Sequence, residues 1–362
     1  MKKTILINIL PVLSFAGLYS SAHADGTWIN CNRTDGYYQF YDSGSVQAGK
    51  DAEVGDVLGD WFTSANPTAW TCSHRKTHEN ATVPITVQGY PPYITKGTIS
   101  VDGATYTIYS TAVKPGLGYI TRWRFTAKGQ TSNWYPLTIA ALGQQTPAEF
   151  FNISYDPNNP QWSFGVDVQT RFVKTGENLT SGRIPLFDPI YVRHYQSYNG
   201  NTDAGGGTYM IAQFRAGQVG IETGGTCTTS DANVTLPPVS RSKFIGIGST
   251  AARASFDLNL IKCPAGLASI NYLFTPTTSI IDNSNGVFAL DNSSTASGVG
   301  LQLLNNQDSP LNFNTKYRFN DYNSSVGNAN YKIPLRVGIY QTENNVNPGS
   351  ISGAVTFTLS YK

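Results

Sequence analysis

The stretch that decides the fold is Ile351–Lys362, which reads I-S-G-A-V-T-F-T-L-S-Y-K. From Val355 onward every second residue is apolar, and the residues between them are threonine or serine. Because side chains alternate between the two faces of a strand, this pattern predicts a β-strand with one buried face. If that strand lies at the edge of a sheet, its unpaired backbone groups are a natural place for another chain to bind.

The rest of the chain has the same character. Short runs rich in β-branched and aromatic residues are separated by glycine, proline and asparagine, and no window has a convincing helical period. The pattern predicts an all-β protein built from two β-sandwiches. The expected strands are 82–88, 97–101, 105–110, 119–125, 136–140, 150–154, 163–172 and 190–194 in the first half, and 233–236, 254–261, 269–275, 299–304, 331–340 and 353–361 in the second.

Residues 1–24 have the features of a secretory signal peptide. Lys2 and Lys3 precede the apolar run Ile5–Leu18, which is too short to span a membrane, and an A-x-A site ends at Ala24. We expect cleavage after Ala24 and an exported, soluble mature protein with no membrane span.

Charged residues make up only 13% of the chain. Removal of the two signal-peptide lysines leaves 23 basic and 23 acidic residues, and neither kind forms a run. This balance gives no support for binding to nucleic acid or to an anionic membrane. The sequence has no nucleotide, metal or hydrolase motif, so we expect no cofactor, no metal site and no enzymatic activity.

The four cysteines are expected to form disulfides in an oxidising compartment. Cys31 and Cys72 lie 41 residues apart, Cys227 and Cys263 lie 36 apart, and a gap of 154 residues separates the two pairs. Three pairings are possible in principle, and local pairing places one disulfide in each of two domains. Each bridge would stabilise its domain by about 2–4 kcal/mol.

A glycine-rich stretch between Asn199 and Cys227 marks the expected domain boundary. The mature chain is too long for one hydrophobic core of ordinary size. We expect a first domain over residues 25–216, a linker over 217–225, where the sequence reads G-Q-V-G-I-E-T-G-G, and a second domain over 226–362.

The second half contains a series of short motifs. They are Cys227, V-T-L-P at Val234–Pro237, Cys263, G-V-G-L-Q-L-L at Gly298–Leu304, N-N-Q-D-S-P-L-N-F at Asn305–Phe313, and the segment from Asn347 to the end. Together they resemble the pilin domain of chaperone–usher fimbrial tip adhesins, a family that includes GafD-like and FimH-like two-domain lectins. The resemblance implies an incomplete immunoglobulin-like sandwich whose missing strand is supplied by another chain.

The resemblance also implies the assembly partners. A periplasmic chaperone supplies the missing strand first, an outer-membrane usher exports the complex, and the next pilus subunit then donates its own strand. The expected contacts with the chaperone or the donated strand are Phe357, Leu359, Tyr361 and Lys362, with the Lys362 carboxylate held by basic chaperone residues.

The resemblance further implies a location at the pilus tip, on the cell surface. About 200 residues precede Cys227 where a shaft subunit has a short donor strand, so this chain can accept a strand and has no obvious strand to donate. The predicted function is attachment to a host-cell glycan or glycoprotein through the N-terminal, lectin-like sandwich. The alternative is a tip adhesin that recognises a host protein.

Candidate sugar-binding residues come from three stretches of the first domain, because sugar sites combine flat aromatic faces with amide, carboxylate or arginine groups. The stretch T-S-A-N-P-T-A-W-T-C at Thr63–Cys72 resembles a GafD-type segment and makes Asn66 a candidate ligand. In Tyr119–Phe125 the candidates are Arg122, Trp123 and Arg124, and in Gly129–Tyr135 they are Gln130, Asn133 and Trp134. The alternative is that Trp123 is a core residue and that both arginines are solvated on the outer face.

Overall fold

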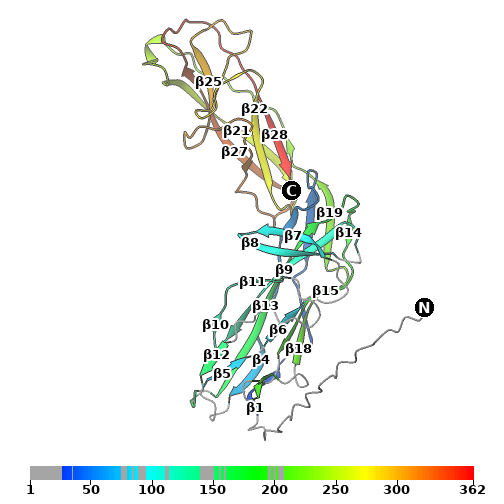
Figure 1. The fold of residues 1–362 in the computed structure, drawn as a ribbon. Coiled ribbons are helices and arrows are strands. Elements are labelled where there is room, and N and C mark those ends of the chain that lie inside the picture. Colours follow the sequence, from blue (N-terminus) through cyan, green and yellow to red (C-terminus); the bar gives the residue numbers. More distant parts are fainter. Residues whose placement is uncertain are drawn as a thin grey trace, which may run out of the picture.

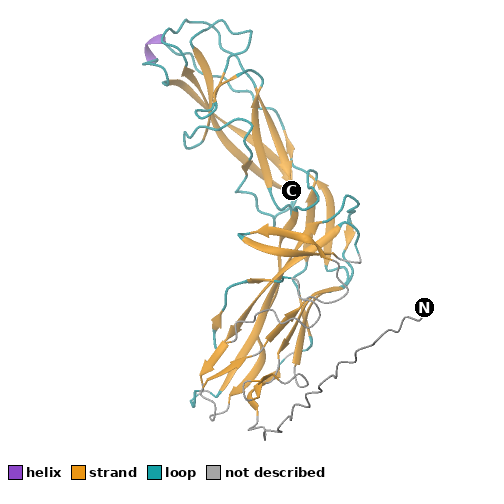
Figure 2. Cartoon of the chain, viewed as in Figure 1, coloured by secondary structure: helices purple, strands orange, loops and turns teal. Residues whose placement is uncertain are grey.

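The computed structural model describes residues 27–34, 36–74, 80–83, 85–88, 95–110, 114–138, 151–154, 156–158, 160–194, 197–198, 201–202 and 208–362. These residues form two β-rich lobes joined end to end, with the C-terminus at the junction (Figure 1). Strands dominate both lobes, and the single turn of helix, η1 (Arg241–Lys243), lies at the far end of the second lobe (Figure 2). The expected all-β, two-domain class is confirmed, and the expected signal peptide lies outside the described residues.

A large twisted sheet is the main layer of the first domain. Its central strands are long and antiparallel to their neighbours: β4 (Val57–His74), β13 (Gln161–Lys174) and β9 (Leu117–Ala127). Two short strands, β10 (Gln130–Thr131) and β11 (Tyr135–Pro136), also pair with β9. The order is β17 (Asn201–Thr202), β16 (Ser197–Tyr198), β1 (Thr27–Arg33), β4 (Val57–His74), β13 (Gln161–Lys174), β9 (Leu117–Ala127), β8 (Ala104–Ser110) and β7 (Thr95–Val101), with β10 (Gln130–Thr131) and β11 (Tyr135–Pro136) beside β9.

Smaller sheets complete this domain around a core rich in aromatic side chains, among them Trp70, Trp123, Phe164, Phe172 and Phe214. One sheet runs β2 (Tyr38–Phe40), β18 (Thr208–Phe214), β15 (Phe187–His194) and β6 (Ile85–Gln88). A second runs β14 (Gly182–Arg183), β19 (Val219–Gly225) and β3 (Gly44–Gly49), and a third pairs β12 (Phe151–Ser154) with β5 (Asn80–Val83).

The prediction that residues 217–225 form a linker is wrong. Val219–Gly225 forms strand β19, which pairs in parallel with β3, and Val219 and Ile221 are each 1% exposed within the core of the first domain. Glycine density suggested a loop, but the alternate residues Val219 and Ile221 supply the buried face of a strand. The first domain therefore extends to Gly225, beyond the expected end at residue 216.

The second domain has two facing sheets. The larger runs β20 (Thr228–Thr229), β21 (Thr250–Cys263), β27 (Ala329–Gln341), β25 (Val299–Asn305), β24 (Val287–Phe288) and β23 (Ile280–Asp282). The smaller runs β26 (Tyr317–Arg318), β22 (Ile270–Pro276) and β28 (Val355–Tyr361), so the strand expected at the C-terminus is present and lies at a sheet edge. Apolar side chains from both sheets form one core between them.

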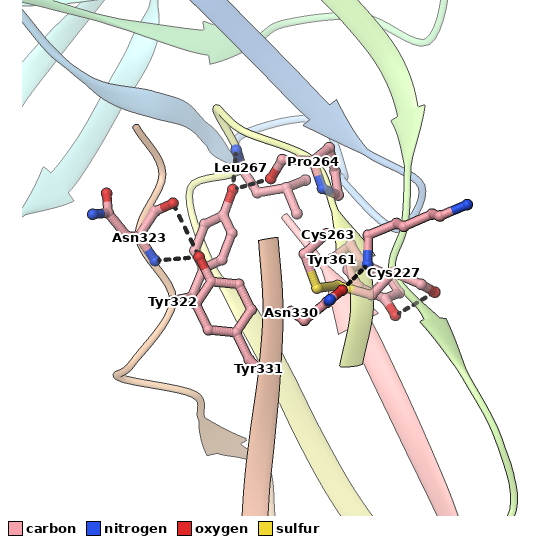
Figure 3. Close-up of a disulfide and its surroundings, with 10 residues drawn as sticks. Cys227, Cys263, Pro264, Leu267, Tyr322, Asn323, Asn330, Tyr331 and Tyr361 are labelled. Atoms are coloured by element: carbon pink, nitrogen blue, oxygen red, sulfur yellow. Dashed lines mark hydrogen bonds between the residues drawn. A yellow bond between two sulfur atoms is a disulfide. The ribbon is translucent and has the colours of Figure 1, made fainter. Parts of the chain in front are cut away.

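Both expected disulfides are present, one in each domain. Cys31 and Cys72 face each other directly across β1 and β4, and Cys227 is bonded to Cys263. The second bridge fixes the start of the second domain to the end of β21 (Figure 3). Among the residues that the structure describes, no helix is both long and apolar enough to cross a membrane.

Candidate functional site

A long groove opens on the second domain beside β28. Its volume is about 1120 Å³, and it lies between β28 and the segment 230–240, which has no regular secondary structure. We call it the β28 groove. Its apolar lining comes from both sheets and includes Leu236, Phe256, Phe274, Leu301, Val337, Ile339 and Phe357.

The apolar face of β28 is only partly covered. Val355, Phe357 and Leu359 alternate along the strand as the sequence predicts, yet each is half-buried although it packs against the core. Phe357 stacks on Phe274 with ring centroids 5.7 Å apart and leaves its outer side toward the groove. A patterned strand whose apolar side chains remain half-exposed leaves an apolar surface at this edge of the sandwich.

The backbone of β28 is also open on one side. β28 pairs only with β22 in its sheet, in a register that runs from Ile270↔Tyr361 to Pro276↔Val355. Nothing else in the described part of the chain pairs with it as a strand. An unpaired edge beside an apolar groove is the geometry that accepts an additional strand from another chain.

The last two residues of the chain lie at the domain junction. Tyr361 is buried, and its hydroxyl donates to Cys227 O at 3.3 Å, next to the disulfide (Figure 3). Burial raises the pKa of Tyr361, although the hydrogen bond to Cys227 acts in the opposite direction. The backbone oxygen of Lys362 accepts from the N–H of Ala268 at 2.8 Å.

The Lys362 side chain reaches into the first domain. Its Nζ lies 2.7 Å from Asp56 Oδ2 and 3.7 Å from Glu53 Oε2. Desolvation alone would lower the pKa of Lys362, but the hydrogen bond and charge of Asp56, together with Glu53, raise it overall. Of the four expected partner-contact residues, Phe357 and Leu359 therefore lie on the open part of β28, whereas Tyr361 and Lys362 contact the rest of this chain.

A second candidate site lies on the outer face of the large sheet in the first domain. We call it the arginine–tryptophan cluster: Trp61 on β4, Arg122 and Arg124 on β9, and Trp134 in the turn before β11. The guanidinium carbon of Arg122 lies 4.1 Å from the Trp61 ring centroid and 5.0 Å from that of Trp134, and that of Arg124 lies 4.5 Å from Trp134. Such cation–π contacts are worth about 0.5–2 kcal/mol each.

Hydrogen bonds fix the two arginines to the neighbouring strand β13. Arg122 Nε donates to Gln169 Oε1 at 2.8 Å, and Arg124 Nε donates to Asp167 Oδ2 at 3.0 Å. Asp102, in the turn between β7 and β8, accepts from Trp61 Nε1 at 3.2 Å and lies 3.6 Å from Arg122. The two cations are thus matched by two carboxylates, so the cluster as a whole is electrically balanced.

The exposed Arg124 is the feature of the cluster suited to binding a polar ligand. The Arg124 side chain remains 37% exposed, and only its Nε takes part in the ion pair with Asp167. Asp167 Oδ1 is buried, so it is closed to a ligand at the surface and the carboxylate serves to hold Arg124. An indole face and guanidinium donors are groups that read hydroxyls and C–H surfaces of a sugar.

The expected sugar-binding residues do not all come together. Trp123 is 1% exposed in the core, so its proposed role in stacking on a sugar is wrong, and the core alternative holds for it. Arg122 and Arg124 face the opposite side of the sheet from Trp123, because neighbours along a strand point to opposite faces. They are stacked on indoles there and are not simply solvated.

Asn66 lies apart from the arginine–tryptophan cluster. It pairs with Val166, which pairs with Phe125, so the register places Asn66 in a row with residues of the buried face. Its Oδ1 accepts from the N–H of Thr68 at 3.2 Å, within an irregular part of β4. Gln130 and Asn133 are exposed near Trp134, at the end of the hairpin that follows β9.

Sequence reasoning missed Trp61, Asp102, Asp167 and Gln169 as members of this cluster. A signal for two of them exists in β13, where Asp167, Gln169 and Arg171 occupy alternate positions and the residues between them are Val168 and Thr170. Arg171 is buried, its Nε donates to Gly59 O at 2.7 Å, and burial lowers its pKa although Asp60 and Asp102 act in the opposite direction. Polar residues at alternate positions of a central strand indicate a polar cluster on one face.

Comparison with known proteins assigns the second domain. Residues 213–362 match the family model described as Fimbrial protein. The F17c-G fimbrial adhesin of Escherichia coli is 33% identical over 141 residues, which is 37% of this chain and 40% of that adhesin. The Type-1 fimbrial protein, A chain, of Salmonella typhi is 29% identical over 144 residues, which is 37% of this chain and 72% of that protein.

A solved structure resembles the chain over most of its length. The alignment with the CupB6 tip adhesin of Pseudomonas aeruginosa covers 92% of this chain and 95% of that one, with 16% identity and a TM-score of 0.36. Residues 213–362 therefore contain a fimbrial-protein domain. The predicted resemblance to fimbrial proteins is confirmed over these residues, and the match spans 40% of the length of the F17c-G adhesin.

Proposed function

We propose that this protein is a fimbrial tip adhesin, held in its pilus by a β-strand that another chain inserts into the β28 groove. The observation that carries the proposal is the combination of an open strand edge with a groove of about 1120 Å³ beside Val355–Phe357, whose lining includes apolar side chains from both sheets. A periplasmic chaperone occupies the groove first, the outer-membrane usher exports the complex, and the next subunit's strand replaces the chaperone. The protein then lies at the pilus tip on the cell surface.

The physical basis of this assembly is β-augmentation. Each backbone hydrogen bond that an inserted strand makes to β28 contributes on the order of 1 kcal/mol. Each apolar side chain that fills the groove adds about 1.5–3 kcal/mol when it is fully buried. An inserted strand therefore stabilises the second domain strongly, and the chain without one is the less stable form.

A thermal-melting experiment tests the groove. The mature chain is heated with a synthetic peptide of alternating valine and threonine, and in parallel with the same peptide carrying proline at alternate positions, which removes backbone donors. The alternating peptide should raise the melting temperature of the second domain, and the proline peptide should not. Equal effects of the two peptides, or none, would exclude strand insertion.

We further propose that the first domain binds a host-cell glycan at the arginine–tryptophan cluster. The balance of two arginines and two aspartates favours a neutral sugar over an acidic one, because a ligand charge would be left uncompensated. A shallow site with a few hydrogen bonds and one stacked ring corresponds to about 4–6 kcal/mol, nearer millimolar than nanomolar affinity. Many pili acting together would then provide firm attachment.

A glycan array tests this second proposal and compares the two faces of the sheet. Trp134→Ala should abolish the signal while the domain stays folded, with a loss of stability of about 1–4 kcal/mol because two cation–π contacts are removed. Asn66→Ala, which alters the other face, tests the site expected from the sequence. If only Asn66→Ala loses binding, the arginine–tryptophan cluster is not the site. If the wild type binds no glycan but captures a host protein, the alternative function is correct.

A further inference from the structure

Hydrogen bonds at the two ends of β28 reveal which of its backbone groups face the open edge. Lys362 N–H donates to Ser269 O at 3.0 Å, and Thr277 N–H donates to Ala354 O at 3.0 Å, so residues 354 and 362 face β22. Successive residues of a strand in an antiparallel pair direct both backbone groups alternately to one side and the other. Residues 355, 357, 359 and 361 therefore direct their N–H and C=O groups toward the open edge.

The last of these four positions is already taken by the first domain. Asp51, in the turn that follows β3, donates its N–H to Tyr361 O at 3.2 Å. The N–H of Tyr361 donates to Asp51 Oδ2 at 3.1 Å. One residue of the first domain thus makes both hydrogen bonds that an added strand would make at Tyr361.

The turn that carries Asp51 is built for this close approach. A Cβ added at Gly49 would lie 2.3 Å from Tyr361 O, so only glycine lets β3 come this near to β28. Gln47 N–H donates to Gly266 O at 2.9 Å on the same side of the junction. The ion pair between Lys362 and Asp56 of the first domain also holds the end of β28 at the domain junction.

We propose that the first domain itself ends the strand-accepting site. Asp51 occupies the backbone pair of Tyr361, so an incoming strand pairs with Val355, Phe357 and Leu359 and stops there. This inference rests on the proposed strand insertion and adds its register. The partner is an extended segment whose apolar side chains alternate over the β28 groove and whose pairing ends at the domain junction, where its chain must turn away from Asp51.

Residue-resolved amide hydrogen exchange of the full mature chain tests the register. The probe is the alternating valine–threonine peptide, made long enough to pass Tyr361. In the free wild type, the Tyr361 amide should exchange at least about tenfold more slowly than those of Phe357 and Leu359, because it alone is hydrogen-bonded. Adding the peptide should slow exchange at Val355, Phe357 and Leu359 and leave Tyr361 unchanged.

Two variants open the blocked position at Tyr361, and a third variant serves as the control. Asp51→Ala removes the acceptor of the Tyr361 N–H, and Gly49→Ala pushes the turn away from Tyr361 O. In both variants the Tyr361 amide should exchange rapidly in the free chain and become protected by the peptide. Asp51→Asn keeps an acceptor oxygen at the same position and should behave as the wild type.

The results separate the register from the function on which it rests. Peptide protection at Tyr361 in the wild type, or rapid Tyr361 exchange in the free wild type, would overturn the assignment of Asp51 as the end of the site. Absence of peptide protection at Phe357 and Leu359 in every variant would overturn strand insertion itself.

Discussion

Replacement of Phe357 by alanine should weaken the binding of an inserted strand in addition to destabilising the free protein. In the free chain the Phe357 side chain is half-buried, stacked on Phe274 at 5.7 Å and near Tyr272 at 6.4 Å. Full burial of a phenylalanine is worth about 3–5 kcal/mol on truncation to alanine, so a half-buried one corresponds to about 2 kcal/mol. An inserted strand would complete its burial.

The predicted loss of binding free energy is the difference between Phe357 half-buried in the free chain and Phe357 fully buried under an inserted strand. Completing the burial of Phe357 adds about 1–2 kcal/mol to the complex, so Phe357→Ala should weaken peptide binding about five- to thirtyfold. Thermal melting of both proteins over a range of peptide concentrations measures the free-chain loss and the affinity loss separately. The stacked pair with Phe274 accounts for part of the free-chain loss.

Thr358→Ala is the matched control, because Thr358 is exposed and points to the other face of β28. It should change neither the stability nor the peptide affinity appreciably. Equal effects of Phe357→Ala and Thr358→Ala would show that the inserted strand does not cover the β28 groove. The same conclusion would follow if Phe357→Ala lowered the stability of the free chain but not its affinity for the peptide.

Three further predictions concern the individual domains. A fragment of residues 25–225 should melt cooperatively, whereas 25–216 should be less stable by about 3–6 kcal/mol because it lacks buried Val219 and Ile221; circular dichroism compares them, and equal stability would contradict the role of β19. Replacing Cys227 and Cys263 by serine should cost the second domain about 2–5 kcal/mol in calorimetry, with the first-domain transition unchanged. Hydrogen bonds, chiefly from Ser293, lower the pKa of Asp291 from 3.8 to about 2, so its stabilising effect is complete above pH 3.8 and is lost as the pH falls through about 2. The protection of the Ser293 amide, taken relative to the intrinsic exchange rate at each pH, should therefore fall over that interval in the wild type and show no such step in Asp291→Asn.

The sequence predicted the second domain more fully than the first because its determinants are local. The alternation in β28 and the spacing of the cysteines can be read from short segments, and the structure has both. β19 was missed because glycine content was given more weight than the alternation of Val219 and Ile221. Tertiary packing decided the assignment, as it often does for strands.

The arginine–tryptophan cluster could be predicted only in part because it is assembled across strands. Arg122, Arg124 and Trp134 are close in sequence and were recognised as candidates. Trp61 and Asp167 come from strands β4 and β13, and their approach depends on the register of those strands with β9. Asn66 and Trp134 could not be assigned to opposite faces without that register.

The parallel pairing of β19 with β3 has a mechanical consequence. The chain passes from the first domain to the second directly after Gly225, the last residue of β19, so a force that pulls the domains apart enters the first domain along this strand. Where such a force runs along β19, it loads the ladder between β19 and β3, from Val219↔Gly44 to Gly225↔Gly49, in shear. A ladder loaded in shear resists more force than one unzipped bond by bond, and the link between the domains is anchored where the first domain is mechanically strong.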